Sequence, residues 1–156
     1  MRTLPKTKLH VSVEIRNTTE QKGLERAVKK AVEKTVPFFR KKGSFSFSVA
    51  LVGTAAMRAL SKAWKGKDKA TDVLSFGFSE VTHDRFPVQD KEVSMGEIVI
   101  CVPYAKKQAR ELDISLTKNI ATLACHGAIH LFGLDHERSQ EEFDATMQIQ
   151  EKVVKG

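Results

Sequence analysis

Residues 126–136 read HGAIHLFGLDH and place three histidines at the spacing that surrounds one transition-metal ion. His126 and His130 are four residues apart, so on a helix both rings project from the same face. Gly133 then ends the helix in a turn that other residues avoid, and this turn can bring His136 back as a third ligand. Three imidazoles leave the fourth position of a tetrahedral Zn²⁺ open to water, as in catalytic rather than structural zinc sites.

The residues around this stretch favour a metal site over an ordinary pair of helical histidines. No Asp, Glu, Lys or Arg lies between Lys118 and Asp135, and burying unpaired imidazoles in so apolar a segment is costly. A bound metal would remove that cost. The same spacing occurs in HExxHxxGxxH metalloproteases, but Gly127 stands where their general base is a glutamate. The stretch therefore predicts metal chemistry and argues against peptide hydrolysis.

Periodicity of apolar residues predicts the elements on either side of the motif. Alternation of apolar and polar residues indicates half-buried strands, and apolar stripes at helical spacing indicate helices. The expected strands are 9–15, 45–51, 71–78 and 93–102, and the expected helices are 20–36, 53–63, 103–112, 116–131 and a last one after 139. The helix over 116–131 is apolar nearly all round, which places it at the centre of the core.

Local signals refine the ends of these elements. Thr19 is the expected cap of the first helix, and Pro37 ends that helix. Ser139 and Glu142 have the spacing of a capping box for the last helix. The polar segment 79–92 reads as a loop rather than a linker between domains.

The pattern as a whole indicates an α+β domain over residues 1–156, with a small mixed four-stranded sheet flanked by about five helices. Residues 98–101 are apolar on both faces, so their strand is expected inside the sheet. The metal site is expected at the end of the central helix. His83, in the polar loop, is expected to be exposed to solvent rather than to act as a fourth ligand.

Composition indicates a soluble globular protein. The chain has 156 residues, of which 41% are hydrophobic and 29% charged. No apolar stretch has the length of a membrane span, and residues 1–7 lack the apolar core of a signal peptide. Cys101 and Cys125 lie in apolar segments and are expected as reduced core residues. We therefore expect a cytoplasmic protein that does not contact membranes.

The formal net charge of +7 favours an acidic partner, of which nucleic acid is the commonest. The densest basic segment holds four lysines within eight residues: Lys62, Lys65, Lys67 and Lys69. Taken alone, such a segment is typical of a solvated turn. Charge therefore suggests nucleic acid without identifying the surface that binds it.

Three ordered segments resemble the YbeY-type endoribonucleases, the bacterial rRNA maturation factors. One of them is the histidine motif at residues 126–136. Residues 65–76, KGKDKATDVLSF, are similar to the family block R-G-x-x-x-P-T-D-V-L-S-F, and residues 95–100, MGEIVI, are similar to L-G-D-I-x-I. Their order, their spacing and the chain length also match, so the resemblance covers essentially the whole sequence.

This resemblance implies a zinc-dependent endoribonuclease specific for single-stranded RNA. It further implies 3′-end maturation of 16S rRNA, a role in ribosome quality control, and association with the ribosome or a ribosomal subunit; DNA is not expected as a partner. The implied fold is a four-stranded sheet flanked by helices, with one Zn²⁺ ion held in a cleft by His126, His130 and His136. The competing hypothesis is a non-catalytic ribosome-assembly or RNA-binding factor with a structural metal, which a three-histidine site with an open position disfavours.

The resemblance also assigns roles to residues outside the ligand set. Lys65 stands where the family has an arginine, so it keeps the charge but not the two-pronged contact with phosphate. Lys65 and His126 are the expected catalytic residues. Lys67 and Lys69 are expected to place the RNA backbone, and Ser75 to hydrogen-bond the substrate. We expect the three other departures to matter less for the chemistry: Ala70 replaces proline, Glu97 replaces aspartate and Leu134 replaces an aromatic residue.

The group that removes a proton during cleavage stays open. Asp135 lies next to a ligand and is expected either to orient an imidazole through a hydrogen bond or to stabilise the turn. Glu137 is another candidate base. Alternatively, the 2′-OH of the RNA attacks, which would explain a preference for RNA and lessen the need for a protein base.

Overall fold

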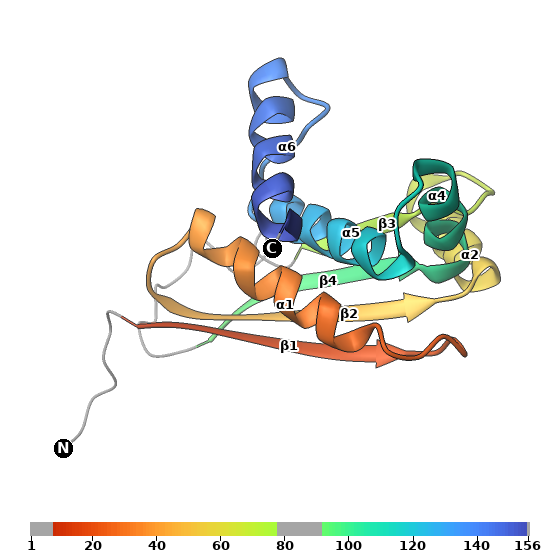
Figure 1. Cartoon of the computed structure of the whole chain (residues 1–156), viewed down its shortest axis with the longest axis horizontal. Coiled ribbons are helices and arrows are strands. Elements are labelled where there is room, and N and C mark those ends of the chain that lie inside the picture. The colour runs from red at the N-terminus through yellow and green to blue at the C-terminus, as the bar shows by residue number, and fades with distance from the viewer. Residues whose placement is uncertain (1–7, 78–91, 156) are drawn as a thin grey trace.

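Four strands form one mixed sheet in the order β1-β2-β4-β3 (Figure 1). The computed structural model describes residues 8–77 and 92–155. Strands β1 (Leu9–Asn17), β2 (Gly43–Val52) and β4 (Val93–Cys101) run parallel, whereas β3 (Val73–Gly77) pairs antiparallel with β4 and forms one edge of the sheet. Residues 98–101 of β4 are buried, which confirms the predicted interior position of this strand.

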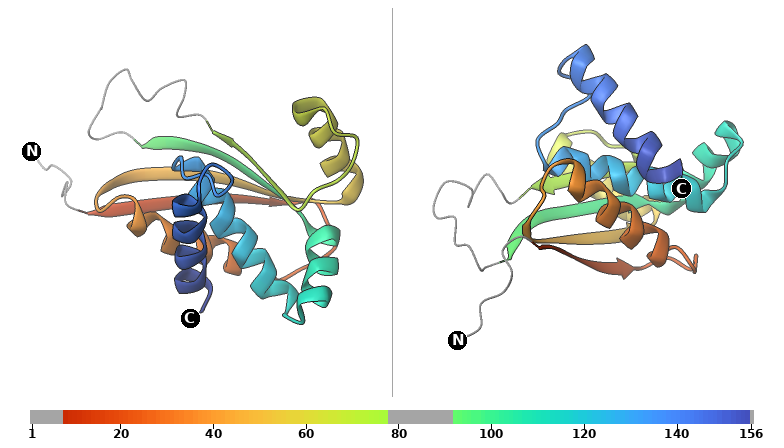
Figure 2. Two further views of the ribbon diagram at one scale, coloured as in Figure 1. Left: turned by 90° about the horizontal axis from the view of Figure 1, so that it is seen from above. Right: turned by 60° about the vertical axis from the view of Figure 1, so that its left-hand side comes forward.

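Five α-helices surround the sheet in the described residues. Helices α1 (Glu25–Thr35) and α5 (Leu116–Leu131) cover one face, and α2 (Thr54–Lys65) lies on the other (Figure 2). Helix α4 (Val102–Leu112) follows β4 directly, and α6 (Gln140–Lys155) packs against α5 and α1. The α+β prediction is therefore confirmed.

Each face of the sheet carries its own apolar cluster. The larger cluster lies between the sheet and helices α1 and α5, and its fully buried members include Val32, Ile98 and Ile129. The smaller cluster forms under α2, where Met57 packs with Leu74 and Val99, among others. Burial of apolar surface on both faces fixes the register of β4 and β3. It thereby fixes the face of the sheet against which α5 packs.

Helix α5 has the bounds that the sequence predicts. Ser115 caps it, because its Oγ accepts a hydrogen bond of 3.1 Å from the backbone N–H of Lys118. At Gly127 the helix approaches the sheet so closely that a Cβ atom there would lie 2.6 Å from Cγ2 of Ile98. The missing glutamate of the protease motif thus marks a position where the fold leaves no room for a side chain.

The first helix starts later than predicted, and the assignment of Thr19 as its cap is wrong. The side chain of Asn17 holds the preceding residues in a loop: its Oδ1 accepts from the backbone N–H of Thr19, and its Nδ2 donates to the carbonyl of Gln21 and to Glu25. Helix α1 begins only at Glu25, after Leu24. These polar contacts compete with the helical hydrogen bonds that the apolar periodicity suggests.

Smaller differences occur at other boundaries. Helix α2 continues to Lys65 rather than ending at residue 63, and β3 starts at Val73 instead of residue 71. Ser139 accepts from the backbone N–H of Glu142 as the capping box requires, but the Glu142 carboxylate makes other contacts, described below. The predicted loop, with His83, lies outside the described residues except for its last residue.

Other predictions concern single side chains and membrane contact. Cys101 and Cys125 are both buried and free, as expected. Cys125 accepts a hydrogen bond from Thr35, and burial raises the pKa of its thiol to about 11, so it stays protonated at neutral pH. No helix in the described part of the chain is long and apolar enough to cross a membrane.

Candidate metal centre and cleft

The structure brings the three histidines of the motif together. One nitrogen from each of His126, His130 and His136 lies within 4.8 Å of the other two, and the ring centroids are 4.7–5.6 Å apart. His126 and His130 project from the last turns of α5, as their spacing predicts. His136 returns through the turn at Gly133, whose φ of +96° favours glycine.

His126 has a partner that fixes its ring. Its Nδ1 lies 2.8 Å from Oε1 of Gln150 on α6. Because an amide oxygen can only accept, Nδ1 carries the hydrogen in the neutral ring, and Nε2 keeps the lone pair that a metal requires. This is the arrangement found around histidine ligands, whose second nitrogen donates to a neighbouring oxygen.

Burial favours the neutral forms of the two helical histidines. Desolvation lowers the pKa of both His126 and His130, and the neighbouring rings lower it further. A neutral imidazole is the form that binds metal. Both rings are therefore held in their ligating state at neutral pH.

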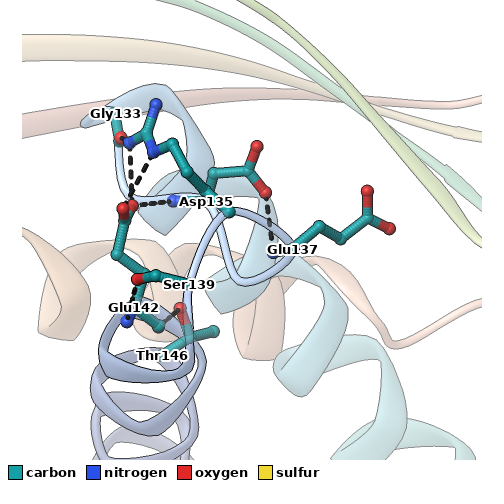
Figure 3. Close-up of polar contacts among 7 residues, drawn as sticks. Gly133, Asp135, Glu137, Ser139, Glu142 and Thr146 are labelled. Carbon is teal, nitrogen blue, oxygen red and sulfur yellow. Dashed lines mark hydrogen bonds and ion pairs between the residues drawn. The ribbon is translucent and has the colours of Figure 1, made fainter.

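A network of charged side chains holds the turn that carries His136 (Figure 3). The Glu142 carboxylate accepts hydrogen bonds from the backbone N–H of Asp135 and from the guanidinium of Arg138, all at 2.8 Å. Arg138 also donates to the carbonyl of Gly133. These contacts lower the pKa of Glu142 to about 2, with the Arg138 hydrogen bond as the largest cause.

The donor set fits a single metal ion. Nδ1 of His136 is buried and has no hydrogen-bond partner among the described residues. A buried ring nitrogen usually has a hydrogen-bond partner. A metal ion held between the three rings would supply the missing partner of this nitrogen. In the part of the chain that the structure describes, no fourth His, Cys or carboxylate joins the group. Three nitrogen donors match an open zinc site.

The three rings line a cleft of about 640 Å³. One wall comes from α5 and α6, with the turn between them. The facing wall comes from the end of α2, the segment 67–72 and β3. The cleft therefore lies mainly between two parts of the chain that are distant in sequence, residues 61–75 and 122–150.

Three of the predicted substrate-binding residues are cleft lysines. Lys65, the last residue of α2, lines the cleft together with Lys67 and Lys69, and all three are exposed. The segment between them is tied to α2 by Arg58, which contacts Asp68 at 2.7 Å. No carboxylate of residues 8–77 and 92–155 forms an ion pair with the three lysines. Within the described residues, no acidic side chain neutralises their charge.

Ser75 also lines the cleft, but its hydroxyl already has a contact. Its Oγ donates to the carbonyl of Gly127 at 3.4 Å, near the limit of a hydrogen bond. Asp72 anchors the same wall, because its carboxylate accepts from the backbone N–H of Val73 and from Gln108. The segment that carries the lysines is therefore held by Asp68, through Arg58, and by Asp72, through Val73 and Gln108.

The two carboxylates next to His136 differ in position. Asp135 accepts a hydrogen bond from the backbone N–H of Glu137, which places its side chain in the turn. No hydrogen bond joins it to a histidine ring among the described residues. Glu137 lines the cleft, its side chain is 81% exposed, and its carboxylate lies 3.8 Å from Nε2 of His136.

Several residues that support the site escaped the sequence-based interpretation. Gln150 is 24 positions from His126, and only the packing of α6 on α5 brings the two together. Arg138 and Glu142 are visible in the sequence as a helical i, i+4 ion pair. Their contacts with the turn were not predicted, because the capping-box pattern assigns Glu142 to Ser139.

Comparisons with known proteins agree with this geometry. The family model described as endoribonuclease YbeY matches residues 11–155. The chain is 36% identical over 126 residues to endoribonuclease YbeY of Persephonella marina, covering 81% of this chain and 78% of that protein. It is 33% identical over 129 residues to endoribonuclease YbeY of Oenococcus oeni, covering 83% of each. The solution structure of TM1509 from Thermotoga maritima has a similar fold, with a TM-score of 0.60 at 26% identity and coverage of 90% and 88%.

Proposed function

The chain belongs to the YbeY endoribonuclease family, and from this premise we propose that it cleaves single-stranded RNA with one Zn²⁺ ion bound by His126, His130 and His136. The observation that carries the proposal is the position of the histidine cluster: it faces three exposed lysines across one cleft. A metal site and a cationic wall are the two features that phosphodiester cleavage needs together.

The metal is proposed as zinc because of its donors. Nitrogen ligands from three imidazoles, with an open position, suit Zn²⁺, and the ion when bound supplies a Lewis acid and an activated water. Gln150 keeps Nε2 of His126 free for this ion, and the network around Glu142 holds the turn of His136. Gly127 carries no base, so peptide hydrolysis lacks its usual proton acceptor.

The lysines are proposed to bind the RNA backbone. Cleavage builds negative charge on the non-bridging oxygens of the phosphate, and a nearby cation lowers the barrier. Lys65 is the candidate for this catalytic contact, and Lys67 and Lys69 would hold the neighbouring phosphates. Because a lysine makes point contacts rather than a planar fork, it orients the phosphate less strictly than an arginine would. Ser75 would hydrogen-bond the substrate, after exchanging its weak contact with Gly127.

Glu137 is the better candidate for the proton acceptor. It lines the cleft and is exposed, whereas the carboxylate of Asp135 is engaged in the turn. Glu137 can accept the proton of either nucleophile, water or the ribose 2′-OH. The chemistry of the product ends distinguishes the two: a 2′,3′-cyclic phosphate identifies attack by the 2′-OH.

The physiological role is proposed from the family. The expected substrate is rRNA, at the 3′ end of the small-subunit 16S RNA, and the expected partner is the ribosome or a ribosomal subunit in the cytoplasm, with a further role in ribosome quality control. The alternative, an assembly factor with a structural metal, is disfavoured because structural zinc normally has four protein ligands. The described residues provide three.

The test compares purified wild-type protein with a ligand variant and a matched control. His126→Ala removes a proposed ligand, and His10→Ala removes an exposed histidine of β1. End-labelled single-stranded RNA, the same sequence as a duplex, and casein are offered to each. We expect wild type and His10→Ala to cleave only the single strand, and His126→Ala to lose the activity. Equal cleavage by all three proteins would indicate a contaminating nuclease and overturn the proposal.

A further inference from the structure

The only tryptophan of the chain lies beside the cleft and faces solvent. Trp64 is 69% exposed, the largest exposed fraction among the large apolar side chains of the described residues. Its one aromatic contact among those residues is Phe76 of β3, at 5.7 Å between ring centroids and 61° between planes. Because the two rings meet edge to face rather than stacked, and the side chain is 69% exposed, most of the indole surface stays open.

The sequence neighbours of this pair tie it to the cleft. Trp64 directly precedes Lys65, and Phe76 directly follows Ser75; Lys65 and Ser75 both line the cleft. Side chains alternate along a strand, so Phe76 and Ser75 project from opposite faces of β3. Since β3 is an edge strand, the Trp64–Phe76 pair lies at the edge of the sheet, next in sequence to two residues that line the cleft.

Three exposed lysines follow Trp64 within five residues of the sequence. Lys65, Lys67 and Lys69 are exposed and connect the end of α2 to the cleft wall. Proteins that bind single-stranded nucleic acid combine these two elements: a cationic track for the phosphates and aromatic side chains on which bases stack. A second aromatic residue, Tyr104, lies within the cleft and is 40% exposed.

We propose that Trp64 is a stacking site for a base of single-stranded RNA, at the point where the strand crosses the β3 edge into or out of the cleft. This inference rests on the proposed function and adds a base contact to it. In a duplex the bases are stacked on one another and cannot reach the indole. Trp64 therefore contributes to the selection of single strands, which the lysines, as phosphate contacts, do not provide.

Tryptophan fluorescence tests the proposal directly, because Trp64 is the only reporter of its kind. The full-length wild-type chain is titrated with a short single-stranded oligouridine in the presence of a chelator, which keeps the RNA intact. An abasic ribose-phosphate oligomer of the same length supplies the phosphates without the bases. We expect quenching by oligouridine and little change with the abasic oligomer or with duplex RNA. Absence of quenching, or equal quenching by all three, would overturn the stacking site.

Variants give the second measurement. Trp64→Ala is expected to raise the dissociation constant for oligouridine roughly tenfold, the range of one lost base–aromatic stack. Trp64→Phe should retain most of the affinity, and Leu112→Ala, which removes another exposed apolar side chain at the end of α4, should retain all of it. Unchanged affinity of a folded Trp64→Ala protein would contradict the proposal.

Failure of this inference is distinguishable from failure of the nuclease function. If wild-type protein cleaves RNA but shows no quenching, the nuclease function stands and the stacking site is contradicted. If wild-type protein is quenched but does not cleave RNA after zinc is restored, the stacking site stands and the nuclease function is contradicted.

Discussion

At the scale of single residues, the contact between His126 and Gln150 shows how a helix far along the chain orients a proposed metal ligand. The 2.8 Å hydrogen bond selects the tautomer of the ring and limits its rotation. The motif predicted that the three histidines lie together, because their spacing is local. It could not predict Gln150, whose position depends on how α6 crosses α5.

Replacing Gln150 by Leu should weaken zinc binding by about 10- to 100-fold, since the ring loses the partner that orients it. Gln150→Glu keeps an acceptor and should bind zinc at least as well as wild type. Gln148→Leu, on the exposed side of the same helix, is the control. Competition with a zinc-binding indicator measures all four proteins. Equal affinities of wild type and Gln150→Leu would show that the hydrogen bond does not support the site.

Lys65 is expected to act on the reaction rather than on the fold. Lys65→Ala should lower kcat/KM for single-stranded RNA at least about tenfold through loss of charge stabilisation at the phosphate. Lys65→Arg should match or exceed wild type, because arginine contacts phosphate with two donors. Lys62→Ala, exposed on α2 but outside the cleft lining, is the matched control. If Lys65→Ala and Lys62→Ala were equally active, Lys65 would have no catalytic role.

At the scale of elements, two features of the fold position the site. One is the close approach of α5 to β4, and the other is the turn between α5 and α6. The close approach of the helix depends on Gly127. In the sequence, this residue only shows that the glutamate base of the protease motif is missing. Its packing against Ile98 could not be inferred, because it depends on the register of the sheet below the helix. The second combines a predicted feature, the turn at Gly133, with contacts of Glu142 that the capping-box pattern assigned elsewhere.

Gly127→Ala should destabilise the protein by about 1–3 kcal/mol, the usual cost of overpacking a core. The added Cβ would lie 2.6 Å from Ile98, so either α5 or the sheet must shift. Gly53→Ala, where a Cβ meets nothing within 4 Å, should cost less. Urea denaturation of the single variants and of Gly127→Ala combined with Ile98→Ala measures the coupling. Purely additive losses in the double variant would contradict the predicted clash.

The Glu142 network makes a pH-dependent contribution to stability. Because its folded pKa of about 2 lies below the ordinary value of 4.5, the contribution is complete above pH 4.5 and is lost as the pH falls towards 2. Glu142→Gln should therefore be less stable than wild type at neutral pH, and the difference should shrink below pH 4.5. Thermal melts across this range measure it. A difference that stays constant with pH would show that the charge of Glu142 is not involved.

At the scale of the whole molecule, the strand and helix types were largely predictable because apolar periodicity determines which faces are buried. The bounds of α5 agree with the sequence, whereas α1 was placed too early because the side chain of Asn17 organises a loop that periodicity does not reveal. The net charge indicated nucleic acid but not the binding surface. Only the fold shows that the basic segment 65–69 faces the histidines across one cleft.

The central claim is that the three histidines hold the metal on which RNA cleavage depends. The most direct measurement is the cleavage rate of single-stranded RNA as a function of zinc occupancy, in protein first stripped by a chelator and then titrated with zinc. We predict no cleavage in the stripped protein and a linear recovery that ends at one zinc per chain. Full activity of the zinc-free chain, or recovery unrelated to occupancy of the three-histidine site, would contradict the claim.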